Sequence, residues 1–247
     1  MVSRYHASSF RGRVEIRVLR TRLCRAPPMS SAELAQRRGV SVPEWCERVG
    51  PARDEPHDML IYSMSVSVDG FIADREGSFH WTVPSDEQFR FHTEQVRELG
   101  GYLCGRRLYE TLLPWETDPT LRDSELGAAF ADAWSVIPKV VFSRTLASVQ
   151  GNARLAAGSV ADELIEALGA TDKDVAIGGA HLAAPAVELG LVDELRMFRN
   201  PIILGGGTPF LPAVPERVEL DLVETKTFAS RVVFERYTRI RTKDAAG

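Results

Sequence analysis

The stretch Ser67-Val68-Asp69-Gly70-Phe71-Ile72-Ala73, followed by Trp81-Thr82-Val83-Pro84-Ser85-Asp86, decides the fold of this chain. It predicts a strand, a loop and a helix start, with Asp86 in the first turn of the helix. A buried carboxyl group at such a place is a candidate proton donor, because desolvation raises its pKa towards the working pH. A first-turn acid also stabilises a helix through its dipole, by about 0.3–1 kcal/mol. Both interpretations of Asp86 stay open.

The composition limits the classes of function. The 247 residues are 44% hydrophobic and 26% charged, as in a typical globular protein. The net charge of -4 gives no electrostatic support for nucleic-acid binding, and no apolar run reaches the roughly 18–20 residues of a membrane span. Three widely spaced cysteines and five histidines form no disulfide framework and no zinc motif. We expect a cytoplasmic protein with no metal and no nucleic-acid or membrane partner.

Residues 1–58 differ in composition from the rest of the chain. They hold 11 arginines, no lysine and seven acidic residues, and only 31–49 has a helical pattern. Three interpretations stay open: a disordered or loosely docked tail, a start codon placed upstream of a true start at Met59, and a regulatory or targeting arm. The predicted organisation is an Arg-rich extension over 1–58 and one folded domain over 59–241.

From Met59 onwards the pattern alternates between strands and helices. Strands are predicted over 59–66, 102–104, 139–143, 174–177 and 195–204, and helices over 86–99, 107–112, 124–136, 159–168 and 181–189. Gly100-Gly101 is predicted to end the first helix. The alternating runs 218–228 and 231–240 predict a terminal antiparallel hairpin. This order indicates an α/β fold, with a mixed, mostly parallel sheet flanked by helices.

Three turns at predicted strand ends carry groups that suit phosphate. Gly105-Arg106-Arg107 and Ser143-Arg144-Thr145 offer cations and hydroxyls, and Gly178-Gly179 lets backbone N–H groups approach an anion at a helix start. Each turn alone is equally explained as an ordinary connection or a solvated helix start. Together, at one edge of a parallel sheet, they predict a dinucleotide with an additional 2'-phosphate, which favours NADPH over NADH.

The same segments resemble the dihydrofolate reductase fold, in the branch formed by the C-terminal reductase domain of the bacterial bifunctional riboflavin-biosynthesis deaminase-reductase. The segments that carry the resemblance are Ser67–Ala73, Gly105–Glu110, Val141–Thr145, Ile177–Gly179 and Asn200–Pro209. The region from Met59 to Ile240 makes up about three quarters of the chain. The resemblance implies a dihydrofolate reductase-like domain over 59–241 that uses NADPH and forms a homodimer.

The resemblance also implies roles for single residues. The adenosine side of NADPH, with its 2'-phosphate, is assigned to Gly105, Arg106, Arg107, Ser143, Arg144 and Thr145. The pyrophosphate is assigned to Gly178, Gly179, Ala180, His181 and Leu182. The nicotinamide is bordered by the segment from Asp69, a catalytic candidate, through Phe71 on the substrate side to Ala73 on the cofactor side. A tryptophan–proline–acid run similar to that of dihydrofolate reductases places Trp81 on the substrate side and makes Asp86 the candidate proton relay.

Departures from the family leave the substrate open. The zinc-deaminase signature has no counterpart in the sequence. The residues after Gly105 are nearer to dihydrofolate reductase than to the riboflavin enzyme, yet no basic residue for a folate glutamate tail is recognisable. We expect NADPH-dependent hydride transfer to a small heterocycle, with 5-amino-6-(5-phosphoribosylamino)uracil as the leading acceptor. The alternatives are a dihydrofolate or pterin reductase, an unassigned small-molecule reductase and a non-catalytic dimeric nucleotide-binding module.

Overall fold

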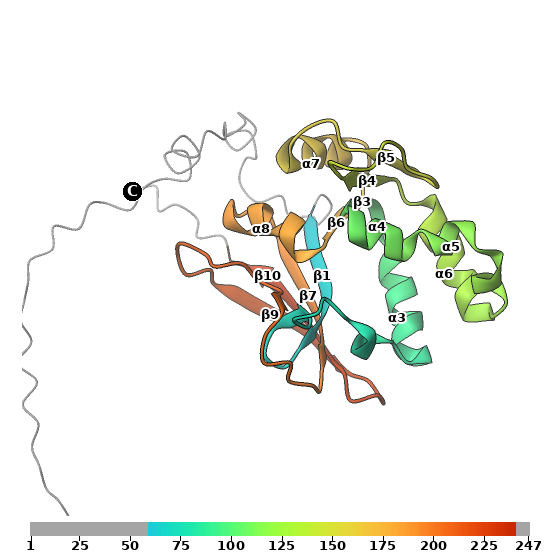
Figure 1. The fold of residues 1–247 in the computed structure, drawn as a ribbon. Coiled ribbons are helices and arrows are strands. Elements are labelled where there is room, and N and C mark those ends of the chain that lie inside the picture. Colours follow the sequence, from blue (N-terminus) through green and yellow to red (C-terminus); the bar gives the residue numbers. More distant parts are fainter. Residues whose placement is uncertain (1–58, 241–247) are drawn as a thin grey trace, which may run out of the picture. The chain divides into compact units, whose positions relative to one another are not determined.

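The computed structural model describes residues 59–240, which are built around one eight-stranded sheet (Figure 1). Its strand order is β5-β4-β3-β6-β1-β7-β10-β9. The strands are β1 (Leu60–Ser67), β3 (Leu99–Gly105), β4 (Lys139–Phe142), β5 (Ala153–Leu155), β6 (Asp174–Gly178), β7 (Glu194–Asn200), β9 (Leu220–Thr227) and β10 (Val233–Arg239). Two short strands, β2 (Phe71–Ala73) and β8 (Thr208–Pro209), pair with each other. The predictions for residues 1–58, and for position 241, lie outside the described residues.

The strand directions confirm the mixed, mostly parallel sheet. All pairings from β5 through β4, β3, β6 and β1 to β7 are parallel. β10 then runs antiparallel to β7, and β9 runs antiparallel to β10, so the last two strands form the expected hairpin. Because the six parallel strands share one direction, their carboxyl ends all open on the same edge of the sheet.

Helices cover both faces of this sheet. They are α3 (Asp86–Arg97), α4 (Arg106–Leu112), α5 (Pro114–Thr117), α6 (Glu125–Val136), α7 (Val160–Gly169) and α8 (Ala180–Glu188), with 3-10 turns η1 (His80–Thr82) and η2 (Pro119–Arg122). On one face, α7 and α8 pack on a core that includes Leu60, Tyr62 and Ile177. On the other face, α3 and α6 pack on Ile61 and Ala176 through Phe89, Phe130 and Trp134. Figure 1 shows the two helical layers on either side of the strands.

The capping signals in the sequence act as expected. Ser85 caps α3 and Ser159 caps α7, and in both helices the side chain three residues later completes a capping box. An aromatic cluster forms where α3 packs on β7 and β10. Phe91 contacts the rings of Phe198 and Phe234 edge-on, and the centre of the His92 ring lies 4.0 Å from that of Phe198. These contacts hold α3 against β7 and β10.

Two local predictions were wrong, and one strand of the main sheet was missed. Gly100-Gly101 does not end α3 but lies inside β3, where a Cβ on Gly100 would collide with the side chain of Thr171. The strand predicted over 195–204 ends at Asn200, because Pro201 offers no N–H to continue the ladder. The strand β5 was not predicted at all.

Within residues 59–240, no helix combines the length and the apolar character that a membrane crossing requires.

Candidate functional site

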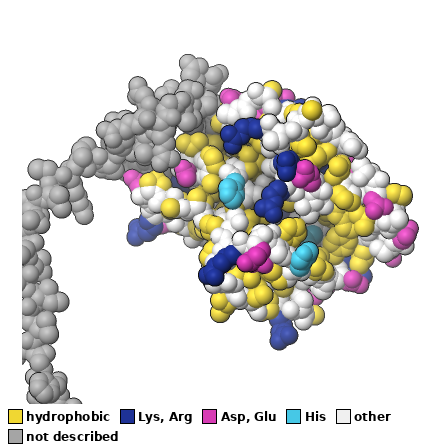
Figure 2. Space-filling model, in the orientation of Figure 1, with side chains coloured by type: hydrophobic (Ala, Val, Ile, Leu, Met, Phe, Trp, Pro, Cys, Tyr) yellow, Lys and Arg dark blue, Asp and Glu magenta, His cyan; other side chains and the backbone are white. Residues whose placement is uncertain are grey.

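The three phosphate-type turns lie side by side at the carboxyl edge of the sheet. Strands β4, β3 and β6 are neighbours, and Gly105 pairs with Phe142 while Cys104 pairs with Gly178. The strands therefore end at the same level, and their following residues open onto one surface. Figure 2 shows Lys and Arg side chains gathered towards the middle of one face of the molecule.

The turn after β3 is held open by a glycine that packing does not require. Gly105 has ordinary extended dihedral angles, and a Cβ placed on it would meet no heavy atom within 4 Å. Arg106 follows at the start of α4, and its Nη1 donates to Thr145 Oγ1 at 2.9 Å. The open space over Gly105 and the adjacent guanidinium suit the close approach of an anionic ligand.

The turn after β4 is shaped by the hydroxyl of Ser143. Its Oγ accepts the backbone N–H groups of Thr145 at 3.1 Å and Leu146 at 3.0 Å, which folds the chain sharply back. The intervening Arg144 is exposed and forms no ion pair with any other residue from 59 to 240. Its positive charge is thus available at the same edge as that of Arg106.

The turn after β6 combines a packed glycine with an open one. A Cβ on Gly178 would collide with Leu108 and would lie 2.6 Å from Tyr102 Oη, so only glycine fits there. Gly179 adopts a φ of 93°, and a Cβ on it would face open space. No side chain caps α8, which leaves the N–H groups at its first turn directed at this opening. Within the predicted pyrophosphate segment, His181 is exposed, Leu182 is half-buried and Ala180 is buried.

Asp69 clamps the glycine loop that follows β7. Its carboxylate accepts the N–H groups of Leu204 at 3.1 Å and Gly205 at 2.7 Å. A hydrogen bond from the Ser67 side chain, followed by these two N–H groups, lowers the pKa of Asp69 below its ordinary value although the side chain is exposed to solvent. An ionised acceptor of this kind suits a structural role, and the catalytic role suggested for Asp69 stays a prediction.

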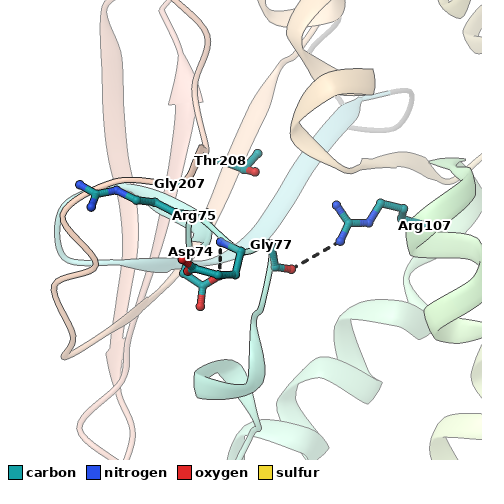
Figure 3. A pocket seen from close by; sticks show the side chains of 7 residues that line it. Asp74, Arg75, Gly77, Arg107, Gly207 and Thr208 are labelled. Atoms are coloured by element: carbon teal, nitrogen blue, oxygen red, sulfur yellow. Dashed lines mark hydrogen bonds between the residues drawn. The ribbon is translucent and has the colours of Figure 1, made fainter.

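A polar hollow lies between the turn after β2 and helix α4 (Figure 3). The Asp74 carboxylate closes this turn by accepting the N–H groups of Glu76 and Ser78, and Arg107 reaches from α4 to the Gly77 carbonyl at 3.5 Å. The hollow has a volume of about 420 Å³ and is lined by Asp74, Arg75, Glu76, Gly77, Arg107, Gly207 and Thr208. Arg107 therefore contacts the turn after β2, and it does not join the pair formed by Arg106 and Thr145. Phe71 and Ala73, in β2 next to this turn, are half-buried.

The substrate-side candidate Trp81 lies between β2 and α3, and the candidate proton relay Asp86 begins α3. Trp81 is half-buried in η1, and its indole Nε1 has no hydrogen-bond partner among residues 59–240. Asp86 is the first residue of α3 and is exposed, because the capping box of Ser85 and Gln88 turns those two side chains inwards. The expectation of a desolvated acid at Asp86 is therefore not met.

Comparison with known proteins places this arrangement in a family. The family model described as the RibD C-terminal domain matches residues 58–234. The chain belongs to the RibD C-terminal domain family. Among relatives, it is 32% identical over 181 residues to the uncharacterised protein YyaP of Bacillus subtilis, which covers 70% of this chain and 91% of YyaP.

Solved structures show the same fold as this RibD C-terminal domain. A putative riboflavin biosynthesis protein from Shewanella sp. PV-4 is similar with a TM-score of 0.59 and 23% identity, over 74% of this chain and 99% of that one. Dihydrofolate reductase from Enterococcus faecalis, complexed with NADP(H) and RAB-propyl, is similar with a TM-score of 0.52 and 18% identity, over 75% of this chain and 98% of that one. The dihydrofolate reductase-like fold is confirmed.

Two residues of the RibD C-terminal domain contribute to the site without having been singled out in the sequence. Arg75 donates to the Gly205 carbonyl at 2.5 Å, and Tyr102 Oη lies against Gly178. Neither shows a local pattern, since both act through contacts with distant segments. Among residues 59–240, His, Cys, Asp and Glu side chains form no group of three that could hold a metal ion.

Proposed function

We propose that the protein is an NADPH-dependent reductase that transfers a hydride to a small heterocycle, with 5-amino-6-(5-phosphoribosylamino)uracil as the leading acceptor. The observation that carries the proposal is the alignment of three strand ends, after β3, β4 and β6, each with groups suited to phosphate. Membership of the RibD C-terminal domain family supports the same reaction class.

The residues at this edge fit the cofactor. Arg106 and Arg144 would hold the 2'-phosphate, with Ser143 and Thr145 shaping the turn between them. The first turn of α8 and the bare backbone at Gly179 would hold the pyrophosphate. When bound, NADPH supplies the hydride, while the chain orients the acceptor and excludes water.

The proton for the acceptor is proposed to come through Asp86. This residue stands at the start of α3, on the side of the sheet where the acceptor would lie. Because Asp86 is exposed, it would relay a proton from solvent rather than store one in an apolar pocket. Asp86→Asn should lower the rate of reduction and leave NADPH affinity unchanged.

The proposal is tested by mixing the protein with NADPH and following the loss of NADPH absorbance with three acceptors. These are 5-amino-6-(5-phosphoribosylamino)uracil, dihydrofolate and a pterin. Turnover of the first supports the leading assignment, and turnover only of the others supports a dihydrofolate or pterin reductase. Tight NADPH binding without turnover of any acceptor would instead support a nucleotide-binding module.

We also propose that the protein forms a homodimer in the cytoplasm. β9 is an edge strand on which Leu222 and Val223 are 55% and 46% exposed, as expected of a surface that pairs with a second copy. The buried free thiol of Cys104 is compatible with a reducing compartment. Light scattering should give twice the chain mass for the wild type and a smaller mass for Leu222→Lys. A wild type with the mass of one chain would contradict the dimer.

A further inference from the structure

Three hydroxyl groups without partners lie on the sheet face that α3 and α6 cover. Ser63 and Ser65 alternate along β1 with Tyr62, Met64 and Val66 and share a face with Ile61, which packs on that helical layer. Tyr102 lies on the same face of β3, edge-on to the Trp134 ring. All three side chains are half-buried, and none of their hydroxyls hydrogen-bonds to another residue from 59 to 240.

The strand register brings these hydroxyls together around Gly178. Tyr62 of β1 pairs with Ile177 of β6, so Ser63 lies beside Gly178 in the next pair along. On the other side of Gly178, Tyr102 Oη lies 2.6 Å from the position that a Cβ would occupy. Leu108 and the Tyr102 hydroxyl fill the space where a side chain of residue 178 would stand, so Tyr102 Oη packs directly on the Gly178 backbone. Ser65 lies two residues further along β1 towards the carboxyl edge and pairs with Phe198 of β7.

The other two hydroxyl groups of β1, on Ser67 and Tyr62, have hydrogen-bond partners within the chain. Ser67 Oγ accepts the Phe71 N–H at 2.9 Å, and Tyr62 on the opposite face donates to the Phe210 carbonyl at 2.9 Å. These bonds follow the general rule that buried polar groups are paired. A half-buried hydroxyl that the chain leaves unpaired is satisfied by water or by a ligand. Ser63, Ser65 and Tyr102 therefore have the properties of ligand-binding groups.

We propose that Ser63, Ser65 and Tyr102 bind the polar edge of the heterocyclic substrate and select a ring that presents both N–H donors and carbonyl or ring-nitrogen acceptors. This inference rests on the proposed function, because it places the acceptor next to Gly178 and the cofactor edge. Hydroxyls both donate and accept, so the row suits a pyrimidinone-type ring. A site built on hydrogen bonds also rejects analogues that lack the matching groups.

The test compares Ser63→Ala, Ser65→Ala and Tyr102→Phe with the wild type. Each should raise KM for 5-amino-6-(5-phosphoribosylamino)uracil, or for dihydrofolate if that is the acceptor turned over, by about 2- to 10-fold. The Kd of NADPH should stay within about twofold, because these hydroxyls do not hold the phosphates. The matched control is Ser135→Ala, near the end of α6. Because the end of α6 leads into the start of β4, Ser135 lies at the edge of the sheet opposite the strands' carboxyl ends. This variant should change neither the KM of the acceptor nor the Kd of NADPH.

A binding measurement separates this inference from the proposed function. The wild-type NADPH complex is titrated with 5,6-diaminouracil and with dihydrofolate by calorimetry, and the titration is repeated with the Ser63→Ala, Ser65→Ala double variant. Weaker binding by the double variant supports the inference. A wild type that does not bind NADPH contradicts the proposed function. Normal NADPH binding with heterocycle affinity that is absent, or equal in both proteins, overturns the role of the hydroxyls alone.

Discussion

Arg106 Nη1 lies 2.9 Å from Thr145 Oγ1, so a single hydrogen bond joins the turns that follow β3 and β4. Arg106 also forms an ion pair with Glu110 at 3.4 Å one helical turn later, where both side chains are about half exposed. These two contacts point the guanidinium at the edge of the sheet before any ligand binds. A preset cation of this kind reduces the ordering that binding requires.

Replacing Arg106 should therefore separate the two nicotinamide cofactors. Arg106→Gln is expected to weaken NADPH binding about 10- to 100-fold, since a charge-assisted hydrogen bond to phosphate is lost. NADH, which lacks the 2'-phosphate, should lose little. Fluorescence titration with both cofactors measures the difference, and Arg122→Gln, at an exposed pair with Asp132, is the control. Equal losses for both cofactors would contradict the assignment.

The two neighbouring glycine turns should respond in opposite ways. Gly178→Ala is expected to destabilise the fold by about 1–3 kcal/mol, because its Cβ would collide with Leu108. Gly105→Ala should leave the free energy of unfolding within about 0.5 kcal/mol, yet weaken NADPH binding where the cofactor must approach the backbone. Urea unfolding and cofactor titration on both variants test the contrast. Loss of stability in Gly105→Ala would contradict the finding that a Cβ at residue 105 meets open space.

Removing the Asp69 clamp should loosen the glycine loop. Asp69→Asn keeps one acceptor oxygen in place of two, so one of the N–H groups of Leu204 and Gly205 loses its partner. Hydrogen exchange at these two amides should speed up severalfold, while amides in β1 stay protected. Because the pKa of Asp69 is lowered in the folded state, this contribution holds above the ordinary carboxyl range and is lost as the pH falls below it. Unchanged exchange would argue against the clamp.

The aromatic cluster under α3 should make stability depend on pH. Burial lowers the pKa of His92 from 6.5 to about 4, so the unfolded chain takes up the proton first. Stability is thus complete above pH 6.5 and falls as the pH drops from 6.5 to 4, by at most about 3 kcal/mol. His92→Phe should remove this part of the slope in urea unfolding at a series of pH values. If the slope remains, other groups are responsible.

The buried ion pair of Lys139 and Glu116, where β4 begins, should show strong energetic coupling between its two side chains. Lys139 Nζ lies 2.8 Å from Glu116 Oε1, and it also donates to the Trp134 and Ile137 carbonyls, with both charged side chains nearly inaccessible to solvent. Lys139→Met should cost about 3–5 kcal/mol, because it strands a buried carboxylate. Lys139→Met with Glu116→Leu should cost less than the two single changes added together. Strict additivity in this double-mutant cycle would contradict the coupling.

Much of this architecture could be predicted from local signals. The apolar, β-branched run of β1 and the capping boxes at Ser85 and Ser159 are read within a few residues. Where prediction failed, tertiary contacts outweighed the local pattern. Gly100 follows a helix as a stop signal would, but it is needed because Thr171 packs where its Cβ would be. The three-residue β5 exists only through its pairing with β4.

The site could be predicted to the level of its turns but not of its contacts. Parallel strands bring their ends to one edge, so the meeting of Arg106, Ser143 and Gly179 follows from topology. The bond between Asp69 and Gly205 spans 136 positions and has no local signature. The exposure of Asp86 depends on how the chain enters α3, which the tryptophan–proline–acid pattern does not specify.

The position of β1 in the sheet affects how the protein is made. This first strand lies in the centre, between β6 and β7, and its nearest partner along the chain, Val175, comes 115 residues after Leu60. A growing polypeptide on the ribosome would therefore carry β1 as an unpaired, apolar segment until most of the domain has been synthesised. We expect truncated chains that end before β6 to aggregate or to be held by chaperones, whereas the full-length chain closes its sheet around β1.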